Sequence, residues 1–132
     1  MPLLGFQSRF APLVESGEKR QTIRAYRKDG RDPKPGDRLY LWTGLRTKGA
    51  RKLGEATAVR VLAVVVHRDG FEAREDDGWA ELSPRPAVRL GSRTAFARRD
   101  GFESWPAMRE WFRSTHGLPF RGLLIEWGEI ER

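Results

Sequence analysis

The chain consists of short apolar segments separated by charged loops, and the spacing of the apolar residues predicts where helices and strands lie. Near the start, the apolar positions are four, three and one residues apart: Phe6, Phe10, Leu13 and Val14. This spacing suits one face of a short helix that begins near Arg9 or Phe10. Proline is tolerated in the first turn of a helix, where Pro12 lies, and Gly17 ends the segment.

A second amphipathic helix is predicted after Ser104, which is a suitable N-cap residue and is followed by Pro106 in the first turn. Its large apolar residues recur at helical spacing: Trp105, Met108, Trp111 and Phe112. The helix should end at about His116, just before Gly117. We interpret this aromatic stripe as part of the core rather than as a surface on which bases stack.

Asp37 to Gly44 has the alternation of a strand, with both of its faces apolar or aromatic. Leu39 and Leu41 point to one face, and Tyr40 and Trp42 point to the other. Either both faces are buried, or one of them presents aromatic rings to a ligand. The pattern therefore leaves open whether the two rings belong to the core or to a binding site.

The remaining strands complete the predicted fold. Glu55 to His67 is a long run dominated by valine and alanine, which is typical of a central strand. Leu123 to Ile130 is a closing strand, and Ala87 to Leu90 is a candidate short strand. Because strands outnumber helices and no βαβ alternation is present, the sequence predicts a mixed α+β fold, mainly β, of the small mixed or barrel type.

Positive charge is concentrated in one third of the chain. Of a net charge of +7, residues 17–52 contribute 12 Lys/Arg against four Asp/Glu, so the rest of the chain sums to −1. Tyr26 to Gly36 and Leu45 to Leu53 are basic loops, whereas residues 68–86 are an acidic surface excursion with one short helix. This placement indicates a polyanion or an anionic ligand, with a merely solvated basic face as the alternative. The candidate nucleic-acid-binding residues are Arg20, Arg27, Lys28, Arg46, Lys48, Arg51 and Lys52.

Composition narrows the chemistry further. A length of 132 residues suits one domain, residues 1–132, and the absence of cysteine excludes disulfides, thiol catalysis and cysteine-bound zinc. The only histidines, His67 and His116, are given no role, and no metal or cofactor is expected. No apolar run approaches the roughly 20 residues of a membrane span, and the start lacks a signal-peptide pattern. We therefore expect a cytoplasmic protein with no membrane contact.

The stretch from Gly17 to Arg24 carries the candidate catalytic residues. Lys19 and Thr22 are three positions apart, so their side chains converge if the segment is bent rather than a regular strand. A threonine hydroxyl attacks an amide carbonyl only if a neighbouring base takes its proton. Lysine serves as that base when desolvation and nearby positive charge lower its pKa. If a carboxylate lies close instead, the acid is the proton shuttle and Lys19 the oxyanion partner.

Five features, in this order along nearly the full length, resemble the ASCH family of the PUA-like superfold. They are Arg9-Phe10, Gly17-x-Lys19-x-x-Thr22-Ile23-Arg24, Gly36-Asp37-x-Leu39, Asp100-Gly101-Phe102 and Leu124-Ile125-Glu126-Trp127. The resemblance implies a closed or nearly closed PUA-like β-barrel flanked by short helices, with a cleft beside the first helix. It also implies a link to RNA, because proteins of the family are connected with RNA and some are small amidohydrolases that act on N4-acylated cytidine.

The resemblance implies that the catalytic residues are Lys19, Thr22 and a carboxylate at Asp100. The enzymes of the family have glutamate at this last position, and aspartate is one methylene shorter. Glu103 is therefore the alternative candidate for the carboxylate. The candidate substrate-binding residues are Arg9, Phe10, Ile23, Arg24, Tyr40 and Trp42. Arg24 could clamp a phosphate or carboxylate through its planar fork, or form a structural salt bridge.

Three functions follow. The first is a hydrolase that removes an acyl group from N4-acylated cytidine or a related nucleoside amide. The second is a non-catalytic RNA-binding PUA-like module, and the third is a ribonuclease of the same family. The expected partner is a modified nucleoside or RNA, and no protein partner is implied.

Overall fold

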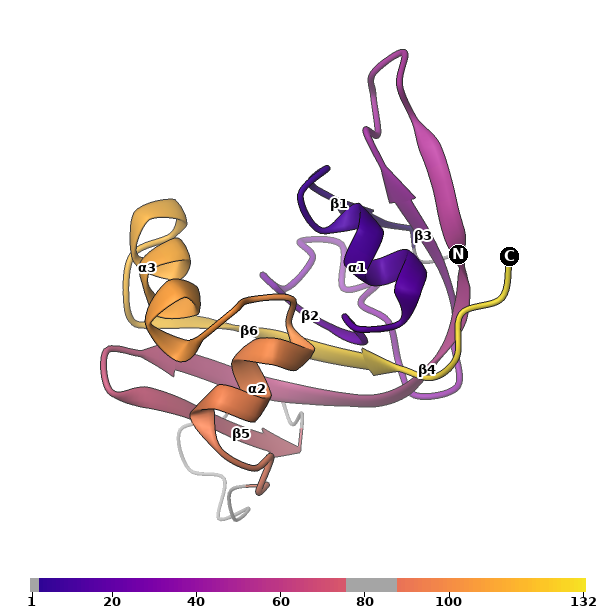
Figure 1. Cartoon of the computed structure of the whole chain (residues 1–132). Helices are drawn as coiled ribbons and strands as arrows, with labels where there is room; N and C mark the ends of the chain where they lie inside the picture. The colour runs from indigo at the N-terminus through magenta and orange to yellow at the C-terminus, as the bar shows by residue number, and fades with distance from the viewer. Residues whose placement is uncertain (1–2, 76–87) are drawn as a thin grey trace.

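The computed structural model describes residues 3–75 and 88–132 as a mainly β structure with three short helices (Figure 1). Its strands are β1 (Leu3–Phe6), β2 (Gln21–Arg24), β3 (Arg38–Thr43), β4 (Arg51–His67), β5 (Gly70–Glu75) and β6 (Phe120–Trp127). Its helices are α1 (Ala11–Ser16), α2 (Arg93–Arg99) and α3 (Trp105–Thr115). Within these described ranges, no helix is long and apolar enough to cross a bilayer.

The six strands form one sheet in the order β1-β3-β4-β6-β2, and β5 pairs with β4 beside this path. Among the strand pairs formed by the described residues, only β1–β3 is parallel. The 17-residue strand β4 joins the two parts of the sheet, since its first part pairs with β3 and its second with β6 and β5 (Figure 1). The register shifts between Ala58 and Arg60, and the Val59 side chain between them is 63% exposed. Such a bulge bends a strand, which lets β4 serve both parts.

The sheet is not closed, so the expected barrel is not confirmed in its closed form. Its two end strands, β1 and β2, share no backbone ladder among the described residues. Instead, two arginines, one in β2 and one three residues after it, reach β1: Arg24 Nη2 donates to the Gly5 carbonyl at 2.6 Å, and Arg27 Nη2 donates to the Leu3 carbonyl at 3.0 Å. The fold is therefore mixed α/β, mainly β, with side chains where a closed barrel would have a backbone ladder.

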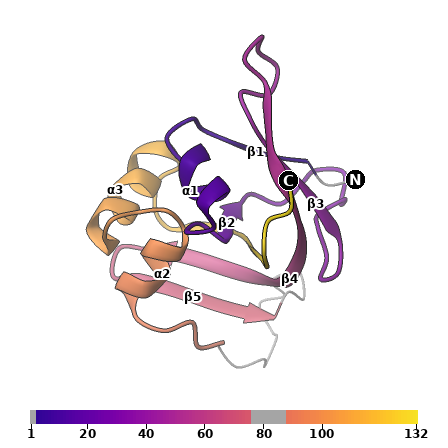
Figure 2. The ribbon, with the colours of Figure 1, turned by 45° about the vertical axis from the view of Figure 1, so that its right-hand side comes forward.

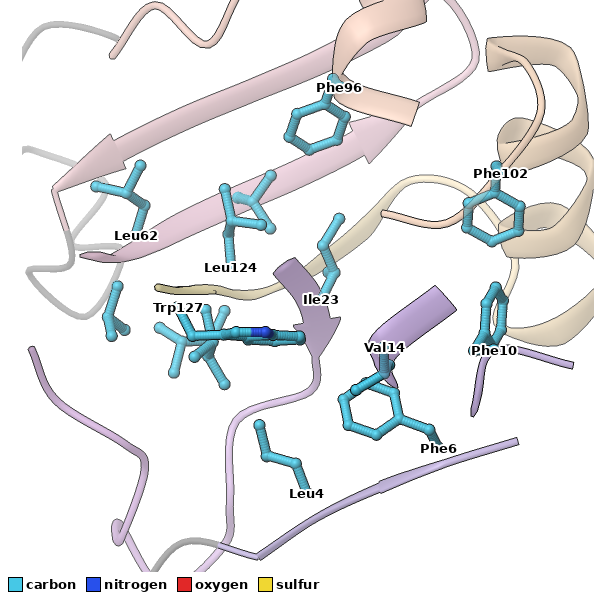
Figure 3. Packing of buried hydrophobic residues seen from close by; sticks show 14 of the residues in the cluster. Leu4, Phe6, Phe10, Val14, Ile23, Leu62, Phe96, Phe102, Leu124 and Trp127 are labelled. Carbon is cyan, nitrogen blue, oxygen red and sulfur yellow. The ribbon is translucent and has the colours of Figure 1, made fainter. Parts of the chain in front are cut away.

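The three helices lie together on one side of the sheet, and the core fills the space between the two layers (Figure 2). Local residues determine where the helices begin and end. Ser92 and Ser104 accept backbone hydrogen bonds as the N-caps of α2 and α3, and Gly17 ends α1 in the left-handed backbone conformation. Large rings dominate the core near α1, where Phe10 packs edge-on against Phe102 (Figure 3). This layer of rings surrounds the candidate site.

Several predicted elements are confirmed. The first helix ends at Gly17, the Ser104-capped helix is α3, and the segments around 37–44 and 55–67 are β3 and most of β4. The closing strand is real but lies at Phe120–Trp127, three residues before the predicted range. Trp105, Met108 and Phe112 are buried, as expected for a core-facing stripe.

Other assignments are wrong. Phe6 belongs to β1 rather than to the first helix, and the second basic loop ends at 50, because β4 already begins at Arg51. Residues 70–75, read as part of a surface excursion, form the strand β5, and 88–90 are not a strand. Helix α2 was not predicted from the sequence. Most of the acidic segment, including its predicted helix, lies outside the described residues.

Candidate active site

Lys19 and Thr22 reach the site from a tight turn and the strand that follows it. Gly17 adopts φ +85° at the end of α1 and donates its N–H to the Val14 carbonyl at 3.2 Å. The Lys19 N–H then returns to the Leu13 carbonyl at 3.0 Å, which folds the chain back onto the helix. Thr22 lies in β2, opposite Ile125 of β6. The predicted bent segment is therefore a turn at Lys19 and a regular strand at Thr22.

Asp100 arrives at the same place from the end of α2. The next residue, Gly101, has φ +92°, and a β-carbon built there would lie 3.0 Å from Phe10 Cδ1 and 3.1 Å from Lys19 Cδ. Both the backbone conformation and the close approach favour glycine. Gly101 thus lets the chain after Asp100 pass directly against the stem of Lys19.

Lys19 and Asp100 form a buried ion pair. Lys19 is 2% exposed and Asp100 4% exposed. The Lys19 ammonium donates to the Asp100 backbone carbonyl at 2.5 Å and lies 3.7 Å from Asp100 Oδ2. Burial lowers the pKa of Lys19 to about 8, and it raises the pKa of Asp100 because the charged carboxylate is desolvated. The charge of each partner opposes the shift that burial causes in the other, so both shifts depend on the pairing.

Arg24 contacts the candidate nucleophile directly. Its Nε donates to Thr22 Oγ1 at 3.0 Å, while its Nη2 donates to the Gly5 carbonyl across the open side of the sheet. Burial lowers the pKa of Arg24 to about 10, yet the guanidinium stays charged at neutral pH. A fixed cation therefore faces the Thr22 oxygen, where negative charge would develop if the hydroxyl lost its proton.

A cavity of about 200 Å³ brings these groups together. Its polar lining includes Lys19, Thr22, Arg24 and Asp100. Six aromatic rings also line it: Phe6, Phe10, Phe102, Trp111, Phe112 and His116. An apolar cavity with a few convergent polar groups is the usual form of a small-ligand site, and its rings suit a planar ligand. Among the described residues, no three His, Asp or Glu side chains gather as a metal site would require.

Not all of the predicted substrate-binding residues reach this cavity. Ile23 lines it beside Phe10, and the exposed Arg9 lies over the Phe10 ring, with its Cζ 4.7 Å from the ring centroid. Tyr40 and Trp42 lie half-buried on β3 and are not among the described residues that line it.

The structure also separates the two candidate carboxylates. Asp100 is buried in the cavity wall, whereas Glu103 is exposed and borders a separate shallow hollow with Glu18 and Arg98. The structure therefore brings Lys19 and Thr22 together with Asp100 rather than with Glu103.

The predicted nucleic-acid-binding residues fall into two groups. Lys28, Arg46 and Lys48 are exposed on loops. The others make contacts within the chain: Arg20 to the Gly17 carbonyl, Arg27 to the Leu3 carbonyl, Arg51 to both oxygens of Glu15, and Lys52 to Glu55. Intramolecular pairing of Arg51 and Lys52 leaves less positive charge on that side than the sequence suggests.

Sequence reasoning missed other residues at the site. Phe102, Trp111 and His116 line the cavity, although His116 was given no role and Trp111 was placed in the core. Gln21 is 1% exposed and donates from Nε2 to Asp100 Oδ1 at 3.1 Å. The only signal in the sequence was its position inside the Lys-x-x-Thr segment, where a polar residue on a buried strand needs a partner.

Comparison with solved structures finds the same architecture elsewhere. A crystal structure of a mutant of the ZmASCH protein from Zymomonas mobilis superposes with a TM-score of 0.54, over 98% of this chain and 68% of that one. The fold is ASCH-like. The sequence identity in the matched region is 12%, so the comparison supports the ASCH-like fold and leaves the activity to be argued from the site. No protein-family model matches the sequence, and no curated protein does.

The ASCH-like fold explains why residues so far apart in sequence meet. The turn after α1 and the end of α2 lie 81 positions apart at Lys19 and Asp100, and both border the same cavity. The arrangement can hold a planar ligand between rings while presenting it with an amine, a hydroxyl and a carboxyl group. An amine, a hydroxyl and a carboxyl group are the kinds of group that nucleophilic cleavage of an amide uses.

Proposed function

We propose that the protein is an amidohydrolase that removes the acyl group from N4-acylated cytidine or a related nucleoside amide. One observation carries this proposal: the buried Lys19–Asp100 pair lines the same cavity as the Thr22 hydroxyl. Burying two charges is costly unless their interactions compensate, so such pairs are frequent at functional sites. The resemblance of the motif around Lys19 and Thr22 to small ASCH amidohydrolases supports the same assignment.

In the first half of the reaction, Thr22 Oγ1 attacks the amide carbonyl carbon, and its proton passes to the neutral amine of Lys19. The C–N bond then breaks, and the departing nitrogen takes that proton to give the free exocyclic amine of cytidine. The acyl group stays on Thr22 as an ester. In the second half, water attacks the ester with Lys19 again as base, which releases the carboxylic acid and restores Thr22.

Two neighbours prepare these steps. The Arg24 Nε–H donates to the Thr22 oxygen, so it stabilises the negative charge that develops there as the proton leaves. Asp100 holds the Lys19 ammonium through its backbone carbonyl and its carboxylate. The opposing assignment, with the carboxylate as proton shuttle and Lys19 as oxyanion partner, predicts a different pH dependence of kcat/KM.

The walls of the cavity favour an aromatic ligand. Phe10, Phe102 and Trp111 surround one another at centroid separations of 5.4 to 6.3 Å, and His116 stacks on Phe120 at 4.4 Å. Unstacked bases are commonly bound between such rings. A modified nucleobase is therefore the substrate that the lining suits.

The direct test is incubation of the protein with N4-acetylcytidine, with cytidine release followed by chromatography. Release by the wild type, and its loss in Thr22→Ala, would support the proposal. Thr43→Ala is the matched control, because Thr43 is also a buried threonine, hydrogen-bonded to the Phe6 carbonyl, on a different strand. Equal loss in both variants would contradict a specific role for Thr22.

The same preparation distinguishes the alternatives. Steeply salt-dependent RNA affinity without turnover would indicate an RNA-binding module instead. RNA cleavage that is lost in Lys19→Ala would indicate a ribonuclease.

A further inference from the structure

Gln21 is the central member of a chain of polar side chains behind the catalytic pair. It lies on β2, 1% exposed, between Asp100 and Arg99. Its Nε2 donates to Asp100 Oδ1 at 3.1 Å, and its Oε1 accepts from Arg99 Nε at 3.4 Å. Arg99 is in turn fixed by its Nη2, which donates to the Leu90 carbonyl. Four groups thus form one continuous chain from the segment before α2 to the cavity.

The order of donors and acceptors in this chain has only one solution. A guanidinium can only donate, so Arg99 requires the oxygen of the Gln21 amide on its side. The amide NH₂ then faces Asp100, and because NH₂ can only donate, Oδ1 of Asp100 must accept. Accepting this hydrogen bond favours the unprotonated form of Oδ1, so a proton on Asp100 is better accommodated on Oδ2, the oxygen that lies 3.7 Å from Lys19 Nζ.

We propose that Gln21, oriented by Arg99, is a positioning residue that keeps Asp100 ionised and turns its Oδ2 toward Lys19. This role of Gln21 rests on the proposed function, because the orientation of the Asp100 carboxyl group matters only if Lys19 and Asp100 exchange protons. The position is not explained by packing alone, since a buried strand residue facing the core is usually apolar. Gln21 acts through Asp100 and does not itself line the cavity with the described residues.

Other charged groups facing Asp100 do not replace this contact. Burial has the largest effect on Asp100 and raises its pKa. The positive charges of Lys19, in the turn after α1, and of Arg24, in β2, favour the ionised carboxylate and lower the pKa. Arg9 acts on Lys19 across the Phe10 ring, and His116, which directly follows α3, lies at the cavity lining. Gln21 is the uncharged group that hydrogen-bonds a carboxylate oxygen, so its removal leaves Oδ1 buried without that donor.

The test is Gln21→Met, which keeps the length and removes the donor. The pKa of Asp100, followed by carboxyl carbon NMR in selectively labelled protein, should rise, because the buried carboxylate loses a hydrogen-bond donor. Arg99→Met should raise the same pKa by a smaller amount. In the Gln21→Met background, Arg99→Met should have no further effect, because Arg99 acts through the amide.

An unchanged pKa of Asp100 in a Gln21→Met variant that still unfolds cooperatively would overturn the inference. Additive shifts of the Asp100 pKa in the double variant would overturn it as well. If Gln21→Met does not fold, the titration of the Arg99→Met variant decides, since its substitution lies on the half-buried end of α2. The NMR measurement needs no turnover. A rise in the Asp100 pKa in a protein that does not cleave the amide would therefore support the positioning role while rejecting the proposed function.

Discussion

Lys19 donates from its side chain to the backbone carbonyl of Asp100 at 2.5 Å, across 81 positions of sequence. A backbone acceptor cannot be removed by mutation of the Asp100 side chain, so the amine keeps one partner in any variant at that position. The carboxylate at 3.7 Å adds charge compensation without the short contact. The backbone thus holds the Lys19 amine in place, and the Asp100 side chain raises the pKa of that amine.

Burial of Lys19 makes the stability of the protein depend on pH. Its pKa falls from 10.5 to about 8, so between these values the unfolded state binds more protons and the free energy of unfolding rises with pH. A fall of about 2.5 units corresponds to about 3 kcal/mol, which is the cost of the buried charge present below pH 8. Relative to Lys19→Met, the wild type should therefore gain stability from pH 8 to 10.5 in urea unfolding.

The control for this measurement is Lys48→Met, which removes an exposed lysine from the loop after β3. A wild-type curve that runs parallel to that of Lys19→Met across the whole range would show that burial does not penalise the ammonium.

The pH dependence of turnover identifies the base. If neutral Lys19 accepts the Thr22 proton, kcat/KM for N4-acetylcytidine should rise tenfold per pH unit below about pH 8 and level off above it. If the carboxylate is the proton shuttle and Lys19 a cationic oxyanion partner, the rate should instead fall above about pH 8. Stopped-time assays from pH 5.5 to 9.5 separate the two assignments.

Arg24 and Arg27 offer a matched pair of substitutions. Both donate to carbonyls of β1, but only Arg24 also donates to Thr22 Oγ1. Arg24→Gln should lower kcat by about 10- to 100-fold, because a charge-assisted hydrogen bond contributes about 1.5–3 kcal/mol. Arg27→Gln should lower stability slightly and leave kcat unchanged. Equal effects of the two substitutions on kcat would mean that Arg24 acts only by holding the strands together.

Gly101 tests the close approach of the chain to Lys19. Gly101→Ala should destabilise the protein by about 1–3 kcal/mol more than Gly117→Ala. Both glycines have positive φ, so both variants incur backbone strain, but a β-carbon meets no described atom within 4 Å at Gly117. Thermal or urea unfolding of the two variants isolates the crowding. Comparable losses would show that the Lys19 stem moves aside freely.

The sequence predicted the parts of the fold that have strong local signals. The Ser104 cap, the apolar stripe behind it and the valine-rich strand depend on neighbouring residues, and α3 and β4 are where these signals placed them. Strand β1 was missed because it is short and pairs with β3, more than 30 residues further along the chain. Strand β5 was missed although it forms a hairpin with β4, because its residues were assigned to the acidic surface segment. Helix α2 lies in an arginine-rich segment whose apolar face is only Phe96 and Ala97.

The candidate site was predictable only as far as its motif extends. Lys19 and Thr22 stand out as a spaced pair, and the resemblance pointed to Asp100. Gln21 carries no such signal, because its function depends on Asp100 and Arg99 arriving from 78 or more residues away. His116 likewise enters the site through the packing of α3 against the sheet, which no local pattern encodes.

The arginines that bridge the two end strands have a consequence beyond the site. Leu3 and Gly5 are two apart on β1, so their carbonyls point to the same outer edge, and these are the acceptors that Arg24 and Arg27 occupy. A foreign β-strand would need those acceptors to extend the sheet. The guanidinium groups therefore oppose the addition of a foreign strand at this edge, and one of them is the cation that contacts Thr22.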